Sequence, residues 1–441
     1  MIVKPKIYQG SGTYKVRFFY WDVVGGVLTD KVIERYVNAG GTVIAPAIPL
    51  TLTATTKRSP ALEFDSWNIT TLTNIQQDMD VGAIYKNATD GGIRKTHAFI
   101  VVTATTGSTV PIYFNKSDGS TLTINWGDGS ADYTTTSTGN VNTTHAYGAV
   151  GTYEIKMWIS SGAGTYGFSN GSTTTSFIGG NSDAYRSCLM SLFIGDNVTT
   201  IGTYGIYREL KLEKLSIPNN ITSIANSLCS VCTSLSILNV PNSVTSIGDS
   251  SFSSCTRLSV INLPKSLTSI GSSAFYGCSN LNQVIMYDSV ATIGTACFYE
   301  CKALKKLILS SIITAIPASL CSTCSSLSDI VIPATVTSID ANAFEYCVSL
   351  SEVNIPASVT AISDSAFYVA NKIKKYVINL FTAPSTITTL ASTAVFTSIN
   401  AQCRIYVPVA SGDVYKGATY WSTYANYIYE YSTENRALFG D

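Results

Sequence analysis

The sequence predicts a mainly β protein in which two small β modules precede a solenoid of 23-residue repeats. Leucines recur every 23 residues from Leu212 to Leu350, and cysteines recur on the same step. A fixed period of this size is typical of a solenoid, in which each repeat buries its apolar side only against its neighbours. The recurring cysteines are Cys232, Cys255, Cys278, Cys301, Cys324 and Cys347.

Each repeat begins with a short strand. In the repeat that starts at Leu258, this leucine, Ile261 and Leu263 have the spacing of a strand that turns its apolar side inward. Pro264 cannot donate a ladder hydrogen bond and therefore ends the strand. A second short extended stretch is expected over 267–270.

The repeat closes with a turn and an apolar cluster. Gly271 is expected to permit the turn. Ala274, Phe275 and Cys278 have the spacing of one inward-facing helical turn, and the phenylalanines of successive repeats should stack as an aromatic core. The phase holds from Leu189 to Ile373, which predicts about eight turns.

The repeat also carries a family resemblance. The string Ile332-Pro333, Val336-Thr337-Ser338-Ile339, Ala343-Phe344 and Cys347 resembles leucine-rich repeats of the BspA type, which occur on bacterial surface proteins, in some protists and in phage. The resemblance implies a leucine-rich-repeat solenoid over 188–403. It also implies a C-terminal cap and tail over 404–441, with Trp421 covering the last apolar layer.

The cysteines allow three interpretations. Cys229/Cys232 and Cys321/Cys324 have the C-x-x-C spacing of zinc ligands, but four repeats separate the two pairs by about 19 Å, too far to share an ion. Disulfide or redox chemistry is the second interpretation. Core packing is favoured, because Cys229 and Cys321 fill the position that phenylalanine occupies in other repeats and buried free cysteine packs as a small hydrophobe.

The first 90 residues do not follow the pattern of the 23-residue repeats. Residues 1–12 are interpreted as an N-terminal docking segment. Over 13–90, the segments 16–20, 64–68 and 78–85 follow one another in an order that resembles the B-repeat of internalin-type surface proteins, a small β-rich module.

Residues 91–165 contain Trp126-Gly127-Asp128-Gly129 followed by His145-Ala-Tyr147. This order resembles the polycystic-kidney-disease (PKD) type of β-sandwich. Asp128 is interpreted as a turn carboxylate that accepts backbone N–H bonds, with a calcium ligand as the alternative. His145 occupies a packing position of that family. Residues 166–187 are interpreted as a linker or N-terminal cap of the solenoid.

The composition and motifs predict no enzyme. The sequence has two histidines, and it contains no nucleophile elbow, phosphate-binding loop, dinucleotide glycine pattern or H-E-x-x-H motif. We therefore expect no catalytic residue, no cofactor and no metal. With 28 basic and 28 acidic residues, the charge balance gives no reason to expect nucleic acid as a partner. Without a run of about 18 apolar residues, no membrane insertion is expected.

The outward positions of the first strand identify a candidate interaction surface. Three consecutive apolar residues, Ile285, Ile308 and Val331, interrupt a polar column, and an exposed apolar ladder marks an interface unless another part of the protein covers it. A weaker stripe of Tyr276, Tyr299 and Tyr368 follows the core phenylalanines. The column is Ser216, Asn239, Asn262, Ile285, Ile308, Val331, Asn354 and Val377.

Three modules without catalytic groups predict a binding or display protein. No signal peptide begins the sequence, so if Met1 is the native start the chain folds first in a reducing cytoplasm. This favours a phage tail or tail-like-particle component of the virion, which docks to other particle subunits through its N-terminal part and contacts a host cell-surface glycan or protein. The alternative is a secreted or cell-surface bacterial adhesin. A homo-oligomer is a further option.

Overall fold

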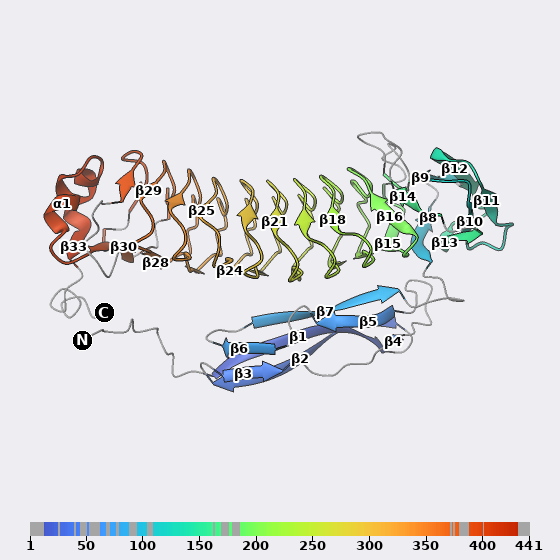
Figure 1. The fold of residues 1–441 in the computed structure, drawn as a ribbon, viewed down its shortest axis with the longest axis horizontal. Helices are drawn as coiled ribbons and strands as arrows, with labels where there is room; N and C mark the ends of the chain where they lie inside the picture. The colour runs from blue at the N-terminus through green and yellow to red at the C-terminus, as the bar shows by residue number, and fades with distance from the viewer. Residues whose placement is uncertain are drawn as a thin grey trace.

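The computed structural model shows a long solenoid with a β-sandwich at one end and a small helical cap at the other (Figure 1). It describes residues 95–103, 109–161, 164–168, 176–178, 186–370, 373, 388–399 and 401–430, with their side chains except that of Asn239. Strands between 13 and 87 and at 375–378 are described by their backbone alone. Mainly β structure was predicted, and this is confirmed.

The N-terminal strands form a sheet of their own. Its order is β2-β1-β7-β5-β4, with β1 antiparallel to β2 and parallel to β7, while β3 pairs with β6. The predicted likeness to an internalin B-repeat stays a prediction. The strands are β1 (Thr13–Val24), β2 (Val27–Asn38), β3 (Gly41–Ile44), β4 (Thr51–Leu52), β5 (Leu62–Trp67), β6 (Thr71–Ile75) and β7 (Met79–Asn87).

The next strands form a sandwich around a shared apolar core. One layer has the order β11-β10-β13-β8 and the other has the order β12-β9-β14. Ile112, Phe114, Ile124 and Ile155 are fully buried between them. The strands are β8 (Thr96–Val102), β9 (Thr109–Lys116), β10 (Thr121–Asn125), β11 (Tyr133–Thr135), β12 (Gly139–Ala146), β13 (Gly151–Ser161) and β14 (Tyr166–Phe168).

Both layers of the sandwich continue into the solenoid. Strand β8 pairs antiparallel with β15 (Leu189–Phe193), and β14 pairs parallel with β16 (Val198–Ile201). The sandwich therefore covers the open N-terminal end of the solenoid by hydrogen bonding, and the boundary at 166–187 is crossed by two sheets rather than by the chain alone. The pairing joins residues about 90 positions apart, so no local pattern predicts it.

Each turn of the solenoid has three sides, and the first is the sheet side. Its strands stack parallel to one another. The solenoid has about ten turns, more than the eight predicted. The two extra strands lie beyond the cysteine repeat, where the 23-residue spacing is lost. The sheet side comprises β15, β17 (Lys214–Ser216), β19 (Ile237–Asn239), β22 (Gln283–Ile285), β24 (Lys306–Ile308), β26 (Asp329–Ile330), β28 (Glu352–Ile355), β30 (Lys375–Ile378), β32 (Arg404–Val407) and β33 (Ile428–Glu430).

The second side carries two-residue strands that stack in the same direction. They end in a buried isoleucine or leucine in most turns, as the predicted second extended stretch requires. This side comprises β16, β18 (Ser223–Ile224), β20 (Ser246–Ile247), β21 (Ser269–Ile270), β23 (Thr292–Ile293), β25 (Ala315–Ile316), β27 (Ser338–Ile339), β29 (Ala361–Ile362) and β31 (Thr389–Leu390).

The third side, which we call the turn side, differs from the prediction of a helical turn. Ser273 and Gly277 have φ values of 54° and 67°, so left-handed residues interrupt any helix there. The N–H of Phe275 donates to the carbonyl of Cys297 in the next turn of the solenoid, at 3.0 Å. Ala274, Phe275 and Cys278 still point inward and are fully buried. Hydrogen bonds to the next turn and short bonds within the same turn, such as the one from the Cys278 N–H to the Phe275 carbonyl, satisfy these backbone groups in place of a helix.

Glycine at position 271 is required by close packing between turns. A Cβ atom there would lie 2.5 Å from Asp249 Oδ1 and 2.6 Å from the Asp249 nitrogen of the preceding turn. The predicted reason, conformational freedom in a turn, is therefore wrong for Gly271.

The core contains the predicted column of aromatic rings. Phe252, Phe275 and Phe298 stack with centroids 5.6 Å apart, and Phe344 stacks on Phe367 at 5.4 Å. A ring fills the space between the three sides in most turns, with Cys229 and Cys321 in its place in two of them, so each turn depends on both neighbours.

A cap of α1 (Gly412–Gly417) and the 3₁₀ helix η1 (Trp421–Tyr427) covers the last turn. Trp421 is buried against Phe396, and its Nε1 donates to the carbonyl of Thr388 at 2.7 Å. The Tyr424 hydroxyl accepts from the Phe396 N–H and donates to the carbonyl of Thr393. The cap thus supplies the hydrogen bonds that a further turn would otherwise make.

Candidate interaction surface

The sheet side presents the predicted apolar ladder. Ile285 and Ile308 are aligned partners on β22 and β24, and Val331 follows in the next turn. The residues before them, Val284 and Leu307, are buried, so the ladder side chains point away from the core. Val331 is 73% exposed, while Ile285 and Ile308 are half-buried.

The polar members of this column are only partly as expected. Asn354 is exposed and Asn262 is half-buried, but Ser216 is buried close to the junction with the sandwich. The side chains of Asn239 and Val377 lie outside the described residues.

The tyrosine stripe lies on the turn side, apart from the apolar ladder. Tyr276 and Tyr299 stack nearly parallel, with centroids 5.0 Å apart and an interplanar angle of 2°. Tyr368 is three turns further along and packs edge-to-face on Tyr346 instead. The structure therefore divides the six candidate residues between two sides of the solenoid.

Sequence reasoning missed four apolar positions, of which Ile237 and Val260 belong to the sheet side. Ile312 and Tyr346 are 45% and 42% exposed. Ile237 and Val260 are half-buried and precede the ladder, in the neighbouring outward column. The 23-residue register would have found the last two, because it places them in the same column as Gln283 and Lys306.

All eleven cysteines are buried free thiols, and six of them form a hydrogen-bonded column. Each Sγ of the column donates to a backbone carbonyl of the preceding turn, at 3.0 to 3.2 Å. Burial as core residues is as predicted. The hydrogen bonds were not predicted: the cysteines fill the core and also donate to backbone carbonyl groups. Cys278, for example, donates to Phe252.

The column is poorly suited to thiol chemistry. Burial raises the pKa of the Cys278 thiol to about 12 and raises those of Cys255, Cys301 and Cys347 well above their ordinary value. The reactive form of cysteine is the thiolate, so these groups are neither nucleophiles nor ready metal ligands at neutral pH. Within the described parts of the chain, no group of three or more His, Cys, Asp or Glu side chains could hold a metal ion.

Asp128 acts as a turn carboxylate in the sandwich. Its Oδ1 accepts from the Ser130 N–H at 3.0 Å, and its Oδ2 lies 2.7 Å from His145 Nε2. Burial raises the pKa of Asp128, but the hydrogen bonds from Ser130 and His145 outweigh it and hold the pKa at about 2. The His145 ring stacks on Trp126 at 4.6 Å, as the predicted packing role requires.

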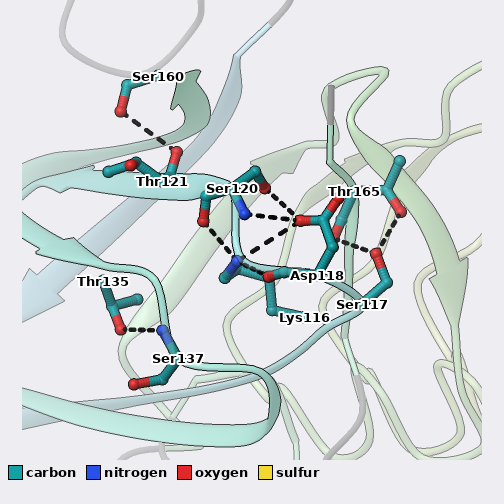
Figure 2. A network of polar contacts seen from close by, with 9 residues as sticks. All are labelled: Lys116, Ser117, Asp118, Ser120, Thr121, Thr135, Ser137, Ser160 and Thr165. Carbon is teal, nitrogen blue, oxygen red and sulfur yellow. Dashed lines mark hydrogen bonds and ion pairs between the residues drawn. The ribbon is translucent and has the colours of Figure 1, made fainter. Parts of the chain in front are cut away.

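A polar network joins the sandwich to the start of β14 (Figure 2). Lys116 is buried, and its Nζ donates to the carbonyls of Asp118 and Ser120. The Ser117 hydroxyl donates to the carbonyl of Thr165, just before β14, at 3.2 Å. These carbonyl oxygens and the Asp118 carboxylate, whose Oδ1 lies 3.7 Å from Nζ, compensate the buried ammonium, so the network has a structural role in this part of the sandwich.

One buried carboxyl group, that of Glu209, lies away from the candidate interaction surface. Glu209 occupies the column position 23 residues before Cys232 and is fully buried. Burial raises its pKa to about 8, against the opposing effects of the Ser176 hydrogen bond and the Arg186 charge. Glu209 is closed off from solvent at the junction with the sandwich, and we assign it no chemistry.

Comparison with protein families finds a match for the solenoid. Residues 168–268 and 245–374 match the BspA type Leucine rich repeat region, in six copies. Over these residues, the solenoid is similar to BspA-type leucine-rich repeats. The match ends short of the sandwich and the N-terminal sheet, so the likeness to PKD-type and internalin modules stays a prediction. No curated protein matches the chain significantly.

Three solved structures that match part of the chain are leucine-rich repeat proteins. A leucine-rich cell surface protein from Faecalibacterium prausnitzii is 28% identical over 41% of this chain and 63% of its own, with a TM-score of 0.29. A leucine-rich repeat protein from Bacteroides ovatus is 23% identical over 55% and 66%, with a TM-score of 0.44. A T. pallidum leucine-rich repeat protein is 27% identical over 35% and 72%, with a TM-score of 0.34. The chain spans less than two thirds of the first two proteins.

Proposed function

We propose that this protein is a non-enzymatic binding protein of the adhesin kind, which holds a large ligand on the sheet side of its solenoid at a cell surface. The observation that carries the proposal is the ladder of Ile285, Ile308 and Val331. These side chains point outward from hydrogen-bonded strands and do not contribute to the core. Exposed apolar residues at fixed spacing on a rigid backbone favour protein contact.

Two further observations support this role. The BspA-type repeats give a long regular surface rather than a catalytic cleft. Among the described residues, the two histidines pair with Glu154 and Asp128 inside the sandwich, away from the ladder. In the described part of the chain, no helix has the length and apolarity needed to cross a membrane.

The test is binding of the labelled full chain to whole bacterial and host cells. The variant Ile285→Asn/Ile308→Asn/Val331→Asn should fold like the parent, because asparagine already occupies this column at 262 and 354, and should lose at least about tenfold in cell binding. The matched control is Ser328→Asn/Ser351→Asn, at exposed positions of neighbouring turns. Equal binding by the triple variant and the parent would show that the ladder does not contribute to cell binding.

Display from a phage tail or tail-like particle, with residues 1–12 as the docking segment, stays a prediction. Mass spectrometry of purified particles checks it. The chain should be found in the particle fraction if it is a tail component, and in the cell-surface fraction if it is an adhesin.

A further inference from the structure

The apolar ladder is part of a longer diagonal band. Outward residues of the sheet side form two columns, because side chains two positions apart in a strand point to the same face. Val260 forms a bridge with Gln283, two residues before Ile285. The band therefore crosses from one column to the other at this turn. We define the diagonal band as Ile237, Val260, Ile285, Ile308 and Val331.

The repeat itself shows that these residues are not needed for folding. Turns outside the band carry polar residues at the same outward positions, such as Lys214, Glu352 and Asn354. The inward position between the two columns is apolar in the same turns, from Leu215 to Val353. Apolar side chains at the outward positions of five consecutive turns therefore serve something other than the core.

Basic residues flank the band where the chain enters its strands. Arg257 and Lys305 are exposed and make no ion pair with any described residue. Lys306 lies beside the ladder, with Asp329 as its neighbour in the next strand. In the turns that carry the band, the positions of Arg257 and Lys305 otherwise hold asparagine, alanine or serine, whereas Lys211 and Glu213 occupy them before the band and Lys372 and Lys374 after it. Arg257 and Lys305 therefore add positive charge beside the diagonal band, and Asp329 is an exposed acidic neighbour.

We propose that the diagonal band docks an amphipathic α-helix of a partner protein, with an apolar stripe over the band and acidic residues over Arg257 and Lys305. This rests on the proposed function and names the partner's chemistry. The band has one apolar side chain per turn, which is a rise of about 4.8 Å along the rod. A helix laid along the rod repeats its apolar stripe about every 5.4 Å, whereas an extended strand repeats one face only about every 6.6 Å. The helix therefore fits the spacing better, and the basic flank requires acidic charge on it.

The test uses synthetic peptides of about 18 residues with leucine at every third or fourth position. One carries glutamate on its polar face, one carries lysine, and a third scrambles the acidic sequence. Fluorescence anisotropy with the full chain should show saturable binding of the acidic peptide alone, weakened by salt. Arg257→Glu/Lys305→Glu should weaken it at least about tenfold and favour the lysine peptide. Ile237→Asn/Val260→Asn should weaken it without changing the charge preference.

The outcomes separate this inference from the proposed function. If the parent binds cells but binds the acidic peptide no better than the scrambled one, the helix is wrong and the binding function stands. If the parent binds no cells, the proposed function fails whatever the peptides do. If the parent sediments as a dimer and the ladder variant as a monomer, a second copy covers the band and the inference is overturned. An unchanged peptide affinity in Arg257→Glu/Lys305→Glu also contradicts it.

Discussion

At the scale of single residues, the cysteine column shows how one side chain serves two purposes. Each column thiol fills a narrow core and donates to a carbonyl of the preceding turn, as Cys278 does to Phe252 at 3.1 Å. Sequence periodicity identified the column but could not identify the acceptor, because the carbonyl belongs to a residue 26 positions away. Serine keeps a donor at this position, whereas alanine removes the donor and leaves a cavity.

We therefore expect Cys278→Ala to destabilise the solenoid more than Cys278→Ser. Alanine should cost about 2 kcal/mol and serine about 1 kcal/mol, measured by urea unfolding. Cys297→Ala is the matched control, because alanine already fills the equivalent positions 274 and 343, and it should cost less than about 1 kcal/mol. A serine variant less stable than the alanine variant would show that the carbonyl does not accept the hydroxyl.

The buried thiols also make stability depend on alkaline pH. Their pKa values are raised in the folded state by burial, so the folded protein holds these protons more tightly than the unfolded chain. Their contribution to stability is complete below the unfolded pKa of about 9 and is lost as pH rises toward the folded pKa, at about 1.4 kcal/mol per pH unit for each thiol.

Removing three thiols should flatten this dependence. The variant Cys255→Ala/Cys278→Ala/Cys301→Ala starts less stable at pH 8 than the parent. Between pH 9 and 10, it should lose about 3 kcal/mol less than the parent, in unfolding free energies measured at each pH. Comparison below pH 10 limits the contribution of tyrosines. Parallel curves for the two proteins would show that the thiols ionise without unfolding.

At the scale of elements, the strands were predictable and the turn side was not. Alternating apolar residues such as Ile261 and Leu263 identify a strand because strand geometry is set by a local period of two. The turn side instead alternates residues bonded to the next turn, the left-handed Ser273 among them, with residues bonded within the same turn. The register predicted the outward ladder correctly, but it could not show that Tyr276 lies on another side from Ile285.

The C-terminal cap makes a prediction at this scale. Tyr424→Phe removes the hydroxyl that bonds the Phe396 N–H and the Thr393 carbonyl, and it leaves the buried Phe396 N–H of the last turn without that partner. We expect a loss of about 1–3 kcal/mol, with faster amide exchange at 388–399 than at central turns. Tyr420→Phe, at an exposed cap position, should change stability by less than about 0.5 kcal/mol. Equal losses from both variants would contradict the capping role.

At the scale of the whole molecule, the solenoid is closed at each end by a different device. The cap bonds to the last turn through side chains, whereas the sandwich extends the first turn by sheet pairing. The sequence indicated two modules here from their distinct motifs. It could not show that they share sheets, because the contact between β8 and β15 is fixed by the packing of both modules together. The sandwich and solenoid should therefore behave as one cooperative unit.

A nicked chain tests this unit directly. A protease site inserted after Asn170 separates β8, β9 and β14 from the solenoid in the chain but leaves their pairing with β15 and β16 in place. The cleaved halves should elute together in size-exclusion chromatography and separate only in denaturant, because two strand pairs and the Ile112–Ile178 bridge hold them. The same site after Asp90 is the comparison, since no strand pair of the described residues joins β1–β7 to the later strands, and cleavage there should release the N-terminal sheet. Separation of the halves after cleavage at Asn170 under native conditions would mean that the sandwich is an independent module.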